Sequence, residues 1–129
     1  MVTTPARRLL VKATTGHDAL ERCAQALTVA STASAAGVPV DLWLVGEAAW
    51  LAVPGRADGW ELPHSPRPVE LRDALLADVA GAGVSLTLCT QCAARRGITA
   101  DDLLPAARVA GAASFVALAV APGVQALVY

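Results

Sequence analysis

Short strand-like segments alternate with helical segments along most of this chain, and this alternation limits the fold more than any other feature. Residues 8–13, 38–45 and 84–88 are apolar, β-compatible runs bounded by turn residues, so each is predicted as a strand. Helices are predicted over residues 18–36, capped by Asp18 and followed by Gly37, and over residues 69–82. Such alternation predicts an α/β fold with a parallel sheet between helices.

Shorter elements lie between these segments. Residues 47–52 form a predicted helical turn, and a short helix is predicted from Cys89 to Arg96. Thr99 and Asp102 resemble a capping box that opens another short helix. Residues 53–68 are rich in proline and glycine, which predicts a long irregular loop of the kind that serves as a lid or binding loop.

Composition excludes several classes of protein. The 129 residues are expected to form one domain, residues 1–129, and 55% hydrophobic with 16% charged residues excludes a disordered chain. Three cysteines are too few for a disulfide scaffold. A net charge of −1, with no basic run beyond pairs and only 4% aromatic residues, argues against a nucleic-acid partner.

The cellular location and the oligomeric state are also predicted from the composition of the chain. Residues 109–129 carry no charge, but Gly111, Ser114, Pro122 and Gly123 interrupt them, so buried elements are predicted rather than a membrane span. No signal peptide is visible, and a reducing cytoplasmic location with free thiols is expected. Alanine is the main apolar residue and buries little area, so the thin core predicts further burial in a homo-oligomer.

The C-terminal segment allows two arrangements from its pattern alone. Residues 114–121 fit a buried strand or a short buried helix, because eight apolar residues show no decisive period. A strand there would form an antiparallel hairpin with residues 125–128. If residues 107–110 are the strand instead, residues 111–124 are long enough for a parallel crossover.

Cys89 and Cys92 form the strongest candidate site. The sequence Cys89-Thr90-Gln91-Cys92 directly follows a predicted strand and opens a predicted helix. Ligands gather at the carboxyl ends of parallel strands, and the N–H groups of a helix start favour a thiolate. Arg95 and Arg96 follow on the same helix and are candidates to add positive potential; both are also typical of solvated or ion-paired residues.

Other candidates have weaker signals. His17 follows the first predicted strand and is a candidate binding residue, whereas His64 lies in the irregular loop. Two cysteines and two histidines are zinc-ligand types, but their spacing matches no finger pattern, so neither a metal nor another cofactor is predicted. Cys23 lies mid-helix on an apolar side and is predicted to be core, as is Trp43.

The chain resembles the DsrE/DsrF-like family over nearly its whole length. The resemblance is carried by residues 84–89, by Cys92-Ala93-Ala94-Arg95-Arg96-Gly97-Ile98, by the first helix with Gly37, by residues 40–45, and by Trp50 with Ala57-Asp58-Gly59. It implies a three-layer α/β/α sandwich around a five-stranded, mainly parallel sheet. It also implies strands at residues 107–110 and 125–128 with a helix over 112–121.

The resemblance also implies a function. Relatives in sulfur-relay systems carry sulfur as a persulfide on a cysteine after the third strand, and Cys89 falls on that position. Many of those relay proteins lack a second cysteine three residues on, so Cys92 places the chain in the less characterised CxxC-bearing branch. Characterised relatives form trimers or hexamers. Sulfur-donor and sulfur-acceptor proteins are the implied partners.

Three functions compete. The first is a sulfur carrier or sulfurtransferase in which Cys89 holds a persulfide, Cys92 releases the product through a disulfide, and the loop of residues 53–68 shields the persulfide. The second is a dithiol oxidoreductase, whose typical motif is CxxC at a helix start. The absence of two features typical of thioredoxins argues against it: no strand preceded by proline is evident beside the site, and Leu88 replaces the usual aromatic residue before the first cysteine. The third is a non-catalytic oligomeric binding module.

Overall fold

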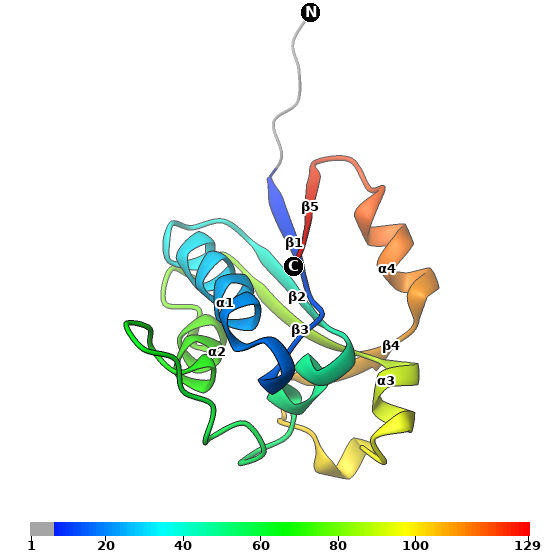
Figure 1. The fold of residues 1–129 in the computed structure, drawn as a ribbon. Helices are drawn as coiled ribbons and strands as arrows, with labels where there is room; N and C mark the ends of the chain where they lie inside the picture. Colours follow the sequence, from blue (N-terminus) through cyan, green and yellow to red (C-terminus); the bar gives the residue numbers. More distant parts are fainter. Residues whose placement is uncertain (1–6) are drawn as a thin grey trace, which may run out of the picture.

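A five-stranded parallel sheet forms the centre of the molecule (Figure 1), which is known from a computed structural model that describes residues 7–129. The strands are β1 (Arg8–Ala13), β2 (Val40–Leu44), β3 (Val84–Cys89), β4 (Ala107–Ala110) and β5 (Val124–Val128). They lie in the order β4-β3-β2-β1-β5, and every neighbouring pair is parallel. The predicted α/β fold is therefore confirmed. The hairpin alternative is wrong, because β5 pairs with β1.

Helices cover both faces of this sheet. The α-helices are α1 (Leu20–Ala35), α2 (Pro68–Ala77), α3 (Thr90–Arg95) and α4 (Ala112–Ala119), and the short 3-10 helices are η1 (His17–Ala19), η2 (Gly46–Ala52) and η3 (Ala100–Asp102). In Figure 1, α1 and α2 lie on one side of the sheet and α4 lies on the other. The result is the three-layer sandwich expected from the sequence. No helix within the described range is long and apolar enough to cross a bilayer.

The two faces of the sheet differ in chemistry. Leu42, Leu44, Leu86 and Leu88 are at most 1% exposed and form the core with α1 and α2. Strand residues alternate between faces, so the residues between these leucines lie on the α4 side. That side is more polar: besides apolar residues such as Leu10, Trp43 and Ala126, it carries Arg8, Lys12, Asp41, Ser85, Thr87, Cys89 and Arg108.

An ion pair with a buried carboxylate belongs to this polar face. The Arg8 guanidinium lies 3.0 Å from the Asp41 carboxylate, and the Ser85 hydroxyl donates to the other carboxylate oxygen. The Asp41 side chain is only 5% exposed. Burying a charge is costly unless it is paired and hydrogen-bonded, and both conditions are met here. The pair lies near the amino ends of the strands, away from the predicted site.

Two predicted helix boundaries are corrected by the structure. Asp18 does not cap α1; its carboxylate accepts the Gly16 N–H at 2.8 Å, and the chain enters α1 through η1. The helix predicted over residues 69–82 ends at Ala77, because Asp78 adopts the left-handed conformation with φ +45°. The Asp78 carboxylate then accepts the N–H groups of Ala82 and Gly83.

Candidate functional site

Cys89 lies where the sequence predicts a reactive thiol. It is the last residue of β3 and directly precedes α3. Both features place its side chain at the carboxyl edge of the sheet, beside the first N–H groups of a helix. The side chain is partly exposed, whereas Cys23 and Cys92 are buried, and all three are free thiols.

A cavity of about 460 Å³ opens beside Cys89 on the α4 side of the sheet. Its walls come from five elements and the loop after β2, with Lys12, Trp43, Val45, Cys89, Gln91, Cys92, Arg95, Ala112, Phe115 and Val116 as lining residues. Most of the wall is apolar, and neither Asp nor Glu is part of it. A concave site with an apolar wall and a few polar groups is typical of small-molecule binding.

The surroundings of Cys89 favour its thiolate. Partial burial raises the pKa of the Cys89 thiol, but hydrogen bonds from the Cys92 backbone and side chain and from the Gln91 backbone lower it by more. The positive charge of Arg95 lowers the pKa further, and the net pKa lies below that of an ordinary cysteine. Because the thiolate is the nucleophilic form of cysteine, this arrangement makes Cys89 reactive.

Cys92 lies directly behind Cys89 and is held in place. It is 4% exposed, and its sulfur accepts the Gly46 N–H at 3.2 Å. Gly46 has φ +58°, and a Cβ there would lie 2.7 Å from the Thr14 carbonyl oxygen, so this turn requires glycine. Cys92 and Cys89 both line the cavity and lie close to each other.

The two predicted arginines have different environments. Arg95 lines the cavity and is exposed. Arg96 instead donates from Nε to Glu47 Oε2 at 2.7 Å and from a terminal nitrogen to the Cys92 carbonyl at 3.1 Å. Arg96 therefore ties α3 to η2 and supports the position of Cys92 without lining the cavity.

Several predicted residues lie outside the cavity. His17 is exposed in η1, where its ring centroid is 6.4 Å from that of Trp60. Trp60 belongs to the irregular loop and packs against Gly16. No residue of this loop lines the cavity at Cys89, so the expectation that the loop shields a persulfide there is not supported by its position. Cys23 is a core residue, as predicted, at 1% exposed.

The sequence analysis named only Cys89, Cys92 and Arg95 as site residues among those of the cavity; the most important of those it missed are Lys12, Trp43 and Phe115. The register aligns Lys12 with Trp43 and Trp43 with Thr87 on one face of the sheet. Phe115 of α4 stacks edge-on against Trp43, with ring centroids 5.3 Å apart. The alternation of polar and apolar residues in β1 would have placed Lys12 on one face, near the carboxyl end of the strand.

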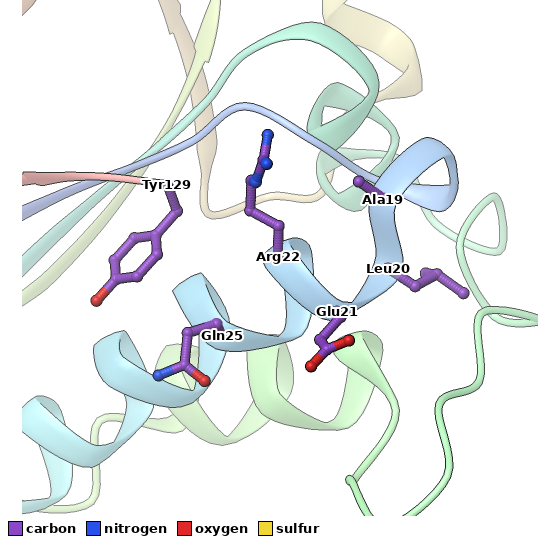
Figure 2. A pocket seen from close by; sticks show the side chains of 6 residues that line it. All are labelled: Ala19, Leu20, Glu21, Arg22, Gln25 and Tyr129. Atoms are coloured by element: carbon purple, nitrogen blue, oxygen red, sulfur yellow. The ribbon is translucent and has the colours of Figure 1, made fainter.

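A second hollow lies at the start of α1, next to the C-terminal residue (Figure 2). In Figure 2 the side chains of Glu21 and Arg22 point in different directions and the Tyr129 ring lies opposite the helix. This hollow has no cysteine or histidine in its lining. Within residues 7–129, no group of three or more His, Cys, Asp and Glu residues is placed to hold a metal ion.

Selective alkylation should distinguish the three cysteines. We expect iodoacetamide to modify Cys89 at a pH where an ordinary cysteine is mostly protonated, since a lowered pKa keeps the thiolate at lower pH. Burial, with a smaller effect of the Asp18 charge, raises the pKa of Cys23 to about 12, so Cys23 should stay unmodified until the protein unfolds.

The measurement is the alkylation rate of each cysteine against pH, followed by peptide mass spectrometry. Arg95→Gln should move the midpoint for Cys89 to higher pH because it removes a favourable charge. A Cys89 midpoint at or above that of free cysteine would contradict this description of the site.

The fold and the site together define a class: a parallel α/β sandwich with a partly exposed cysteine of lowered pKa at the carboxyl edge of its sheet. A profile of the DsrE/DsrF-like family matches residues 7–121. The chain therefore belongs to the DsrE/DsrF-like family, as the resemblance in its sequence indicated.

Solved structures agree with this assignment at the level of the fold. The chain is similar to the YchN protein from E. coli, with a TM-score of 0.74 and 15% identity, covering 95% of this chain and 99% of the other. It is also similar to MTH1491 from Methanobacterium thermoautotrophicum, a protein of unknown function, with a TM-score of 0.62 and 12% identity, covering 96% and 99% of the two chains. No curated protein matches the chain significantly.

Proposed function

We propose that this protein is a sulfur carrier that holds a persulfide on Cys89 and acts as a sulfurtransferase-like protein in a reducing cytoplasm. The observation that carries this proposal is the position of Cys89. It combines a favoured thiolate, partial exposure and an adjacent cavity with a second thiol behind it. Family membership supports the same role.

Loading is a transfer of sulfane sulfur between thiols. The Cys89 thiolate attacks the outer sulfur of a donor persulfide, the donor's S–S bond breaks, and the donor leaves as a thiolate. Cys89 then carries the persulfide. Delivery repeats the step in reverse, since an acceptor thiolate attacks the outer sulfur and Cys89 leaves as a thiolate. Neither step consumes an oxidant or a reductant.

Cys92 provides a second route for release. Its thiolate attacks the inner sulfur of the Cys89 persulfide, a Cys89–Cys92 disulfide forms, and hydrosulfide leaves. The closeness of the two thiols at the cavity supports this role. A cellular dithiol must then reduce the disulfide with two electrons before Cys89 is loaded again.

Intact-mass spectrometry tests the proposal directly. The protein is incubated with a cysteine desulfurase and cysteine, and its mass is measured before and after reduction. The proposal expects a gain of one sulfur atom that reduction removes. Because release through Cys92 also ends in a Cys89–Cys92 disulfide, the same measurement is made on Cys92→Ser, where the carrier retains the added sulfur. The dithiol-oxidoreductase alternative expects a disulfide, seen as the loss of two hydrogens, in the wild type and no sulfur gain in Cys92→Ser. Folded protein that shows neither change would favour the binding-module alternative.

The exposed apolar residues of α4 support a homo-oligomer, which we propose as the working form. No residue of α4 is buried, and Val116 and Val120 are 56% and 76% exposed. A second copy of the chain would cover such a surface, and a trimer or hexamer is expected. Sedimentation velocity should therefore give a mass above that of the 13.1 kDa monomer. A monomer at micromolar concentration would contradict the proposal.

A further inference from the structure

Two cationic side chains that no carboxylate of the described residues neutralises lie around the cavity at Cys89. Lys12 and Arg95 both line it. Neither forms an ion pair within residues 7–129, and the cavity wall contains no carboxylate. In the described part of the chain, Arg8, Arg67, Arg72 and Arg96 are paired with acidic residues, whereas Arg7, Arg22, Arg56 and Arg108 are unpaired like Lys12 and Arg95 but lie outside the cavity. The charge of this cavity is therefore open to a negatively charged ligand.

The position of Lys12 is maintained by packing. Its ammonium nitrogen lies 4.8 Å from the centroid of the Phe115 ring, in a cation–π contact. Phe115 in turn packs on Trp43, which is the register neighbour of Lys12 in the sheet. The charge of Lys12 is thus presented at the cavity by two aromatic side chains.

Trp43 forms a fixed apolar part of the cavity wall. Trp43 is only 4% exposed, and it forms part of the cavity wall. Its indole N–H is buried and has no acceptor within residues 7–129. Because this N–H is shielded from the cavity as well as from solvent, Trp43 presents apolar ring surface to the cavity and no donor.

The wall limits which anion fits. Apart from the two cations, Gln91 and the two cysteines, the lining is apolar and includes Phe115 and Val116. Such a wall suits an organic body more than a small, strongly hydrated inorganic anion. The volume of about 460 Å³ is within the range of sites for small organic molecules.

We propose that the cavity binds low-molecular-weight organic hydropersulfides that carry a carboxylate, and that Lys12 and Arg95 hold this carboxylate while Cys89 takes the sulfur. This inference rests on the proposed carrier function and names its donor. The Cys89 thiolate attacks the outer sulfur of R–S–SH, forming Cys89–S–SH. The donor's S–S bond breaks, and the thiol leaves as R–S⁻ and takes a proton from water.

A pair of alkylating reagents tests the anion site without sulfur chemistry. Iodoacetate and iodoacetamide are similar in size, but only iodoacetate carries a carboxylate. The ratio of their rates at Cys89 cancels changes in the amount of thiolate. We expect the ratio to exceed that of free cysteine, and to fall about threefold in Lys12→Met and in Arg95→Gln, the size of a partly exposed charge interaction.

Arg22→Gln is the matched control. Arg22 is an exposed arginine of α1, on the other side of the sheet, and should leave the ratio unchanged. Lys12→Arg should restore most of the preference, which a loss of folding would not allow. A wild-type ratio equal to that of free cysteine, or one that Lys12→Met and Arg95→Gln do not change, would overturn the inference.

A second measurement separates this inference from the proposed function. Sulfur uptake is compared between the hydropersulfides of N-acetylcysteine and of its neutral amide. The inference expects faster uptake from the acid, with the difference reduced in Lys12→Met and Arg95→Gln. Equal uptake from both, or uptake from a protein persulfide alone, would overturn the inference and leave the carrier function intact. No uptake from any donor would overturn the carrier function and the donor assignment with it.

Discussion

Replacing Cys89 with serine is expected to abolish sulfur uptake, the largest effect that we predict for a single substitution. A serine hydroxyl has nearly the shape of the thiol but forms no persulfide. Its neighbours, the N–H groups of α3 and the charge of Arg95, favour a thiolate and cannot replace it. The measurement is intact mass after treatment with cysteine desulfurase and cysteine, with a reduced sample for comparison.

The other two cysteines provide matched controls. Cys23 lies in the core, away from the cavity. The Cys23→Ser variant should therefore take up as much sulfur as the wild type if it stays folded. Cys92→Ser should still take up sulfur and should release it more slowly to a thiol-free buffer, because the route through the Cys89–Cys92 disulfide is lost. Sulfur uptake by Cys89→Ser, or its loss only in Cys92→Ser, would show that the carrier residue has been misassigned.

Leu75→Ala is expected to lower the free energy of unfolding by about 3 kcal/mol, within the range for deleting a fully buried leucine side chain. Leu75 is 0% exposed and is part of the core formed by α1, α2 and the sheet. The cost combines the lost transfer of apolar atoms from water with the cavity that remains. Urea unfolding followed by circular dichroism measures the change.

Val79→Ala is the control for this prediction. Helical spacing places Val79 on the same side as Leu75, but the structure ends α2 at Ala77 and leaves Val79 93% exposed. Its replacement should change stability by less than about 0.5 kcal/mol, as is usual for a surface position. A similar loss for both variants would mean that α2 continues past Asp78 and buries Val79.

This pair also shows where sequence patterns stop being informative. The period of Leu71 and Leu75 predicted the buried side of α2 correctly. The end of the helix depends on whether the chain continues the helix or forms side-chain hydrogen bonds at Asp78, and the hydrophobic period carries no information about that choice. The carboxylate of Asp78 binds two N–H groups of the following turn, and this local gain ends the helix before Val79.

The candidate site likewise contains one part that the sequence predicted and one part that it did not. The position of Cys89 at a strand end and helix start was predictable, because both signals are local and lie next to each other in the sequence. The grouping of Lys12, Trp43 and Phe115 around it was not. These residues come from β1, β2 and α4, and they meet only because of the strand order and the place where α4 packs.

The amino-acid sequence alone determined the alternation of strands and helices, the parallel sheet and the reactive thiol at its edge, since hydrophobic period and turn residues act over short distances. The tertiary structure decided which cations surround that thiol and which arginine stabilises the fold instead. It also placed the irregular loop away from the cavity, with Trp60 packed against Gly16. Each of these depends on contacts between residues far apart in the chain, and such contacts form only when the whole core packs.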